Sequence, residues 1–271
     1  MNGSASRASS ARAGWLARRA APLAAAAVLL GSAAAVQAQS PVVYQLTPVA
    51  DTSIFGAQGG GTEVDGISDG MGPNLWTSVT AGGITRRALL RFDLSSLPAD
   101  AQIVSVQLQL FEVRARDEHV LSLHRVLGAW GEGNSNGGDA GAGAPAQAGD
   151  ATWSHRVWPN VPWNQRGGDF VADPSSTLSV GLGPGTFTWG STPQMVADVQ
   201  GWLTQPASNH GWMLIGDDTG LQNAKRFVSR NSAGTQGLPT LIVSVVPEPG
   251  TYLLMLAGVA SLLLVVSRRR G

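Results

Sequence analysis

Ile103–Leu110 reads Ile-Val-Ser-Val-Gln-Leu-Gln-Leu, the most regular pattern in the chain. The apolar side chains of Val104, Val106, Leu108 and Leu110 alternate with serine and glutamine. Successive side chains of a strand point to opposite faces, so strict alternation is typical of a half-buried strand. The pattern predicts such a strand, with these four apolar side chains on its buried face.

Further short apolar runs lie on both sides of this strand, separated by Gly, Pro, Asp and Asn. They cover residues 42–46, 75–79, 88–94, 120–126, 186–189, 212–215, 226–229 and 241–245. Eight or nine strands of this kind predict an all-β fold, either a β-sandwich or a jelly roll. One short helix is expected, because Thr192 can cap a segment with Pro193 in its first turn and Val196, Val199 and Leu203 on one face.

The composition supports strands and excludes several kinds of site. The chain has 35 glycines and 15 prolines among 271 residues, which favours many turns, and no cysteine. Disulfide scaffolds, thiolate zinc sites and cysteine nucleophiles are therefore excluded. Residues 39–246, expected to form one domain, hold 11 basic and 17 acidic residues, a net charge of −6 that argues against nucleic-acid binding. Within them, residues 133–150 are Gly- and Ala-rich and predict an irregular loop.

The N-terminus has the pattern of an export signal. It carries arginines and no acidic residue before Asp51, followed by an apolar run at 20–30 and the small-residue ending Val36-Gln37-Ala38. This order predicts a secretory signal peptide over residues 1–38. The alternative is a buried N-terminal helix.

The C-terminus, residues 247–271, combines three elements. Pro247, Glu248 and Pro249 precede an apolar stretch at 252–266, and the arginine triplet Arg268, Arg269 and Arg270 follows. The apolar stretch is long enough for a short transmembrane segment, with the arginines on the cytoplasmic side. The tail is therefore predicted to hold the protein in the membrane before any processing.

These three elements resemble the PEP-CTERM sorting signal of Gram-negative bacteria. The resemblance implies recognition by an exosortase, a membrane protease that removes the tail. It also implies transient anchoring in the inner membrane, followed by localisation at the cell surface or in the extracellular biofilm matrix. The alternative is an ordinary C-terminal anchor.

The body resembles a second family. The run Arg86–Pro98 (Arg-Arg-Ala-Leu-Leu-Arg-Phe-Asp-Leu-Ser-Ser-Leu-Pro) and the alternating strand after it look like the core of the DNRLRE domain, carbohydrate-binding module family 96. Other segments agree in order: 50–52, 124–126, 130–132, 152–153, 162–163, 167–170, 209–212 and 229–230. For residues 39–246 the resemblance implies a jelly-roll β-sandwich that binds polysaccharide, often acidic.

Four tryptophans are candidate sugar-binding residues. Trp130, Trp153, Trp158 and Trp163 cluster in a polar, turn-rich segment rather than in a predicted core strand. An exposed indole offers a flat apolar face on which a pyranose ring can stack. The alternative is that these rings pack irregular segments onto the sandwich.

Four arginines are candidates for binding an acidic sugar. Arg87 and Arg91 share one face of a predicted strand, and Arg226 and Arg230 share one face of another. Guanidinium groups bind carboxylates bidentately, so two neighbouring basic strands would suit a uronic-acid polymer. The alternative is ion pairing within the fold.

No cofactor is expected, although one segment is a candidate calcium site. Asp51, Glu63, Asp65 and Asp69 lie in or near a Gly-rich segment, and oxygen-rich loops can bind calcium. The alternative is a solvated polar loop.

The sequence therefore predicts an exported, non-catalytic polysaccharide-binding protein. It has no Gly-x-Ser-x-Gly motif, phosphate-binding loop or dinucleotide fingerprint. Two alternatives stay open: a structural matrix protein that binds no glycan, and a glycan-degrading enzyme, since only three-dimensional structure can show a catalytic pair of carboxylates.

Overall fold

The computed structural model describes residues 40–234, 236–246, 258–259 and 266–267. The strands are β1 (Val42–Leu46), β2 (Pro48–Ala57), β3 (Ile67–Ser68), β4 (Asn74–Val79), β5 (Ile84–Phe92), β6 (Gln102–Arg114), β7 (His119–Arg125), β8 (Ala144–Pro145), β9 (His155–Val157), β10 (Val161–Pro162), β11 (Ser176–Val180), β12 (Gly185–Trp189), β13 (Trp212–Ile215), β14 (Lys225–Val228) and β15 (Thr240–Val246). The helices of residues 40–246 are α1 (Pro193–Thr204) and the 3-10 turns η1 (Gln58–Gly60), η2 (Gly138–Ala140) and η3 (Pro206–Ser208). Strands make up 41% of the structure, which confirms the predicted β-rich fold with one short helix.

Both predicted targeting segments fall largely outside this description. The predicted signal peptide, residues 1–38, is not among the described residues, and of the predicted span at 252–266 only residues 258, 259 and 266 are. Within the described parts of the chain, no helix has the length and apolar character needed to cross a bilayer.

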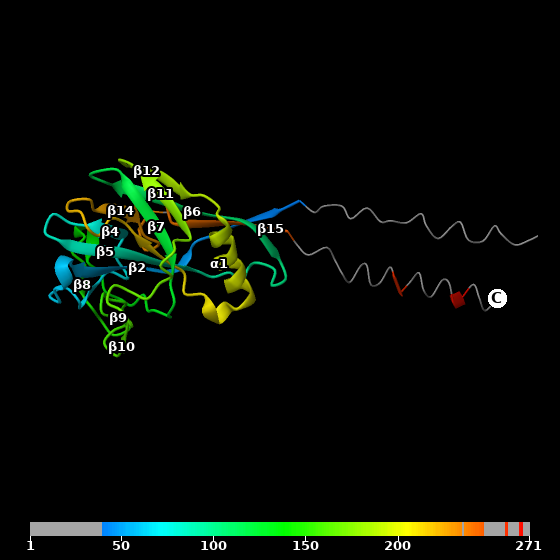
Figure 1. Ribbon diagram of the computed structural model, residues 1–271, viewed down its shortest axis with the longest axis horizontal. Helices are drawn as coiled ribbons and strands as arrows, with labels where there is room; N and C mark the ends of the chain where they lie inside the picture. The colour runs from blue at the N-terminus through cyan, green and yellow to red at the C-terminus, as the bar shows by residue number, and fades with distance from the viewer. Residues whose placement is uncertain (1–39, 235, 247–257, 260–265, 268–271) are drawn as a thin grey trace, which may run out of the picture. The chain divides into compact units, whose positions relative to one another are not determined.

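The strands form one curled antiparallel sheet (Figure 1). Its order is β1-β15-β6-β14-β4-β5-β13-β7-β11, with β12 added beside β6 and β2 beside β5. β4 pairs with β14 along most of its length and with β5 at Ser78 and Val79, so it links the two halves of the curl. β3 pairs with β2 and with β8 in the same sheet, and β9 and β10 form a separate small ribbon.

The main hydrophobic core lies inside the curled sheet. It contains most of the side chains that were predicted for the buried face of β6. Val106, Leu108 and Leu110 are buried there. The prediction for Val104 is wrong: it is 47% exposed, and Ile103 is buried in its place. The pairing of β15 with β6 shifts register between Ser244 and Val245, and this irregularity reverses the inward side of β6 at its first residues.

β2 is the longest of the strands that the apolar patterns did not indicate; the others are β3, β8, β9, β10 and β11. It pairs with β5 along its whole length, and nearly all of its residues are buried. Segments between Val126 and Phe170 cover the outer face of these strands and form a second apolar cluster with Ile54 and Leu89. Because β2 is covered on both faces, its sequence lacks the alternation of a half-buried strand.

The helix begins as predicted and packs beside the start of β6. Thr192 Oγ1 accepts a hydrogen bond from Met195 N at 3.0 Å, which caps the helix. Gln200 Oε1 accepts one from Ile103 N at 2.9 Å. From this end β6 runs 13 residues, roughly 40 Å, to Arg114 at the opposite end of the curl.

Candidate functional site

The ion pairs divide the basic residues of the body into two groups. In five pairs, Arg87 contacts Asp218, Arg125 contacts Asp198, Arg166 contacts Asp65, Lys225 contacts Glu112 and Arg230 contacts Glu132. Six arginines have no carboxylate partner among the described residues: Arg86, Arg91, Arg114, Arg116, Arg156 and Arg226. Four of these six line one pocket, so unneutralised positive charge is concentrated there.

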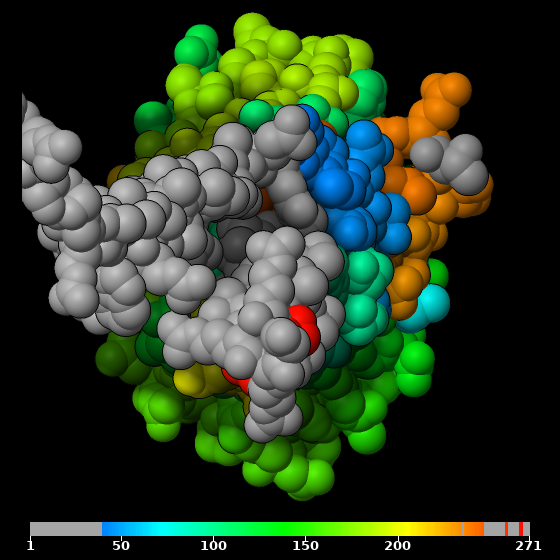
Figure 2. All heavy atoms as spheres, turned by 90° about the vertical axis from the view of Figure 1, so that its right-hand side faces the viewer, coloured from blue at the N-terminus to red at the C-terminus, as the bar shows by residue number. Residues whose placement is uncertain are grey.

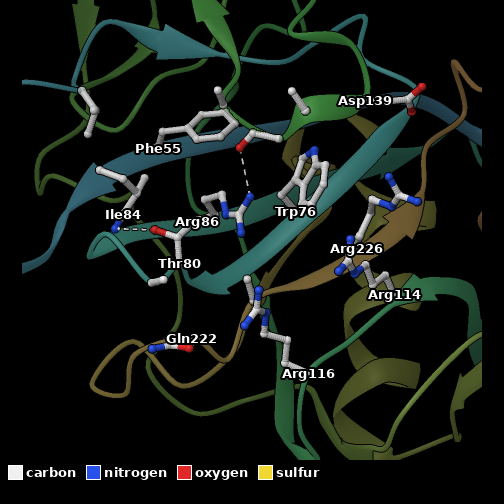
Figure 3. A pocket seen from close by; sticks show the side chains of 16 residues that line it. Phe55, Trp76, Thr80, Ile84, Arg86, Arg114, Arg116, Asp139, Gln222 and Arg226 are labelled. Atoms are coloured by element: carbon white, nitrogen blue, oxygen red, sulfur yellow. Dashed lines mark hydrogen bonds between the residues drawn. The ribbon is translucent and has the colours of Figure 1, made fainter.

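The pocket has a volume of about 750 Å³ and lies where β4, β5, β14 and the end of β6 meet (Figure 3). We call it the arginine pocket. Its lining residues are Phe55, Val64, Trp76, Thr80, Ala81, Ile84, Arg86, Arg114, Arg116, Asp139, Ala140, Gly141, Ala142, Gln222, Ala224 and Arg226.

Strand register explains why the arginines meet. Arg226 of β14 lies opposite Trp76 of β4 on one side and opposite Arg114 of β6 on the other. Residues opposite one another on paired strands share a face of the sheet. Arg86 reaches the same place from β5, which pairs with the end of β4. Three strands, the consecutive β5 and β6 and the distant β14, thus direct their cations into one pocket.

Two of the guanidinium groups pack against the ring of Trp76. The Cζ atoms of Arg86 and Arg226 lie 4.7 and 5.7 Å from the centroid of its ring, within cation–π range. In Figure 3 the two side chains flank the indole. The ring is therefore in contact with two cations and positions both of them at the pocket.

Arg86 is the most enclosed of the four arginines. It is 3% exposed and donates from Nη1 to the carbonyl oxygen of Gly141 at 3.0 Å. Burial lowers its pKa to about 10, which still leaves it charged at neutral pH. The buried Nε atoms of Arg86 and Arg226 have no acceptor among the described residues. Buried hydrogen-bond donors without an acceptor favour a ligand that supplies oxygen acceptors.

The wall opposite the strands comes from residues 133–150, which were expected to be irregular. This segment contains η2 and β8. Asp139 accepts a hydrogen bond from Asn74 Nδ2 at 2.9 Å, and Gly137 N donates to Asp69 Oδ1 at 2.7 Å. Burial raises the pKa of Asp69 to about 6, while the hydrogen bond from Gly137 acts in the opposite direction. Contacts with β4 and the residues before it thus hold this wall in place.

The four tryptophans singled out in the sequence do not line this pocket. Trp130 and Trp163 are 3% and 5% exposed, and their indole N–H groups donate to the carbonyl oxygens of His210 and Thr152. The exposed ring faces that the sugar-platform interpretation requires are therefore absent at these two positions. Trp153 and Trp158 are half-buried. Arg87 covers the Trp153 ring, and His155 packs edge-on against Trp158.

The predicted basic faces are also separated. β4 lies between β5 and β14, and of the four predicted arginines only Arg226 reaches the arginine pocket. Arg87 pairs with Asp218 at 2.6 Å, and Arg230 pairs with Glu132 at 2.7 Å. Arg91 lies over the Trp130 ring. Arg87 and Arg230 thus follow the alternative interpretation, ion pairing within the fold, whereas Arg91 makes a cation–π contact instead.

The sequence candidates did not include Trp76 or three of the four arginines of the pocket, Arg86, Arg114 and Arg116. Arg86 belonged to a basic segment, but its neighbour Arg87 appeared equivalent because alternation does not show which face is covered. Arg114 ends the long strand and Arg116 follows two residues later, and this Arg-Ala-Arg pattern is the one signal that could have directed attention to them.

The candidate calcium ligands lie apart. Asp51 is buried in β2 and accepts hydrogen bonds from Ser229 Oγ and Arg230 N, Glu63 is exposed, and Asp65 pairs with Arg166. Among the described residues, no three histidine or acidic side chains come together as a metal site would require.

One comparison with known proteins identifies the tail. Residues 245–270 match the PEP-CTERM protein-sorting motif, which includes the Pro-Glu-Pro and the arginine triplet predicted as its parts. The match indicates exosortase-dependent sorting of an exported protein to the surface of a Gram-negative bacterium. No curated protein matches the chain.

Proposed function

We propose that this protein is an exported, non-catalytic polysaccharide-binding protein that takes acidic glycan chains in the arginine pocket. The observation that carries the proposal is the convergence of four of the six unpaired arginines on one pocket. The resemblance of residues 39–246 to the DNRLRE domain supports both a polysaccharide ligand and a jelly-roll arrangement of the curled sheet.

The chemistry of the pocket favours charge recognition. Arg86 and Arg226 are fixed by Trp76, and guanidinium groups bind carboxylate or sulfate oxygens through paired charge-assisted hydrogen bonds. A volume of about 750 Å³ falls within the range of small-ligand sites. The ligand is therefore an acidic sugar unit held by its anionic group, rather than a neutral ring stacked on an indole.

The lining of the pocket supports binding rather than hydrolysis. Asp139 is the one carboxylate among the lining residues, whereas glycoside hydrolysis ordinarily uses two. Asp139 also accepts a hydrogen bond from Asn74, which gives it a structural role at the pocket wall.

Sorting by the tail completes the proposal. The PEP-CTERM motif brings the protein to a membrane protease and to the cell surface. There the pocket would hold matrix or environmental polysaccharide, and the protein would act as a surface-displayed or matrix-bound lectin.

Affinity electrophoresis of the full chain in gels containing a polyuronate, compared with gels containing a neutral glucan, tests this function. We expect retardation by the polyuronate only. The double variant Arg114→Gln/Arg116→Gln removes two exposed guanidinium groups and should weaken binding about tenfold, or roughly 1.4 kcal/mol. Arg156→Gln is the matched control, since Arg156 is also unpaired but lies outside the pocket.

Two results would contradict the proposal. If the wild-type chain binds no acidic polymer, the structural-matrix alternative is favoured. If the double variant and Arg156→Gln are weakened equally per charge removed, binding follows overall charge and not this pocket.

A further inference from the structure

Exposed valines gather at the end of the sheet opposite the arginine pocket. Val42 and Val43 of β1 are 45% and 57% exposed, and Val104 of β6 is 47% exposed. The register places them together, because Val245 of β15 pairs with Val42 on one side and with Ile103 on the other. We call Val42, Val43, Val104 and the strand end Val246 the valine rim. Figure 2 looks onto this end, with β1 in blue.

The strands that carry the rim have no charge there. No residue of β1, of β15 or of β6 from Gln102 to Leu110 is charged. The nearest charged residue before β6 is Asp100. Edge strands that face water usually carry charged side chains, so an uncharged, valine-rich edge indicates a surface that is covered in use.

The sorting motif begins inside this rim. Its match starts at residue 245, while β15 continues to Val246, where it pairs with Gln102. Folded body and sorting signal therefore share two residues, and no linker separates them.

Chain length then limits how far the rim can lie from a membrane. From Val246 to the start of the predicted apolar segment at Tyr252, a fully extended chain reaches roughly 20 Å. The headgroup layer on one side of a bilayer takes up roughly 5–8 Å of that distance. The remaining gap is little wider than a single helix, about 10–12 Å across.

We propose that the valine rim rests on the lipid headgroup region while the tail is in the membrane. This inference rests on the predicted anchoring of the tail in the membrane before processing. Apolar side chains are stabilised when they move from water into the membrane interface. The short connection to the tail keeps the valine rim within reach of that interface. Because β6 runs roughly 40 Å from the rim to Arg114, the arginine pocket then faces away from the bilayer.

The lack of native cysteine allows a direct test, because one introduced cysteine can be labelled uniquely. We would label Val104→Cys in the full chain with a solvent-sensitive fluorophore and reconstitute it in vesicles of phosphatidylethanolamine and phosphatidylglycerol. Val120→Cys is the matched control: Val120 is 56% exposed on β7, next to His119, whose side chain contacts Ser78 near the pocket.

With vesicles, emission from position 104 should shift to the blue, iodide quenching should fall, and quenching by spin-labelled lipid should rise. Position 120 should stay accessible to iodide. If the chain floats with vesicles but position 104 behaves like position 120, the rim proposal is overturned while membrane anchoring stands. If the chain does not float with vesicles, both fail. Protection that requires added exosortase would assign the rim to a protein contact and overturn the lipid proposal.

Discussion

Asp51 shows how a single buried carboxylate ties distant segments together. It has no exposed surface, and its side chain accepts hydrogen bonds from Ser229 Oγ at 2.9 Å and Arg230 N at 2.8 Å. Its own backbone N–H donates to Glu132. One residue of β2 thereby fixes the segment that follows β14 and the loop that carries Glu132. Burial raises the pKa of Asp51 to about 7, despite these hydrogen bonds.

That raised pKa makes stability depend on pH in a defined direction. The ordinary value is 3.8, so the folded chain binds more protons than the unfolded chain between about pH 4 and pH 7. The contribution of Asp51 to the free energy of unfolding is therefore complete below that window and is lost as pH rises through it. Asp51→Asn removes this titration, and a tenfold difference in proton affinity between the folded and unfolded chains corresponds to about 1.4 kcal/mol.

Urea denaturation of both proteins at several pH values between about 5 and 8 measures the effect. Relative to wild type, the variant should gain stability as pH increases. Parallel pH profiles would show that Asp51 keeps an ordinary pKa in the folded chain.

Gly141 is required by a close approach at the pocket wall. Its φ is +71°, and a Cβ at this position would lie 2.7 Å from carbon atoms of the Trp76 ring. Gly141→Ala should therefore displace the wall or the indole and weaken binding to an acidic polymer. Gly138→Ala is the matched control, because Gly138 has a φ of +63° but no neighbour within 4 Å of the added carbon.

Both alanines carry the backbone strain of a positive φ, which costs on the order of 1 kcal/mol. Only the Gly141 variant adds a steric clash, worth about 1–3 kcal/mol. Thermal melts and affinity electrophoresis should separate the two variants. Equal losses in both would indicate that backbone strain alone, and not contact with Trp76, decides the effect.

Among the secondary-structure elements, β6 and β14 are joined by a buried ion pair. Lys225 and Glu112 have no exposed side-chain surface, and Lys225 Nζ lies 3.4 Å from Glu112 Oε1. The same ammonium group donates to the carbonyl oxygens of Asp117 at 2.7 Å and Gly181 at 3.2 Å. Burial raises the pKa of Glu112, although Lys225 acts in the opposite direction. The pair thus anchors the strand ends that present Arg114 and Arg226.

Removing one partner of this pair should cost far more than removing both. Lys225→Met leaves the Glu112 carboxylate buried without its cation, and we expect a loss of about 3–5 kcal/mol. Lys225→Met/Glu112→Gln removes both charges and should recover most of that loss. Chemical denaturation of the two variants tests this expectation, and a double variant no more stable than the single one would contradict it.

Local sequence patterns predicted some of the strands and the helix cap, but not others. The bounds of β1 and β13 and the cap of α1 follow the sequence patterns closely, because each depends on neighbours in the chain. β2 was not predicted, because segments from residues 126–170 cover its outer face and its sequence therefore does not alternate between apolar and polar residues. Val104 turned outward because of an irregularity in the pairing with β15, which no pattern within β6 reveals.

Over the whole molecule, the curled sheet separates two chemically different ends. At one end β4, β5, β6 and β14 gather unpaired arginines around Trp76. At the other, β1, β6 and β15 expose valines beside the start of the sorting motif. β6 contributes to both ends, so a single strand links the proposed binding site to the proposed membrane contact.

The sequence alone determined the β-rich class, the single capped helix and the sorting tail, since alternation, capping and a linear motif are all local properties. It also made arginine and tryptophan the candidate binding residues, but could not show which of them line a pocket. Whether Arg86 or Arg87 reaches a pocket, and whether an indole is buried by a loop, depends on which strands pair and what covers each face. Those are long-range contacts, and only the tertiary structure decided them, bringing Trp76, Arg86, Arg114, Arg116 and Arg226 into one pocket.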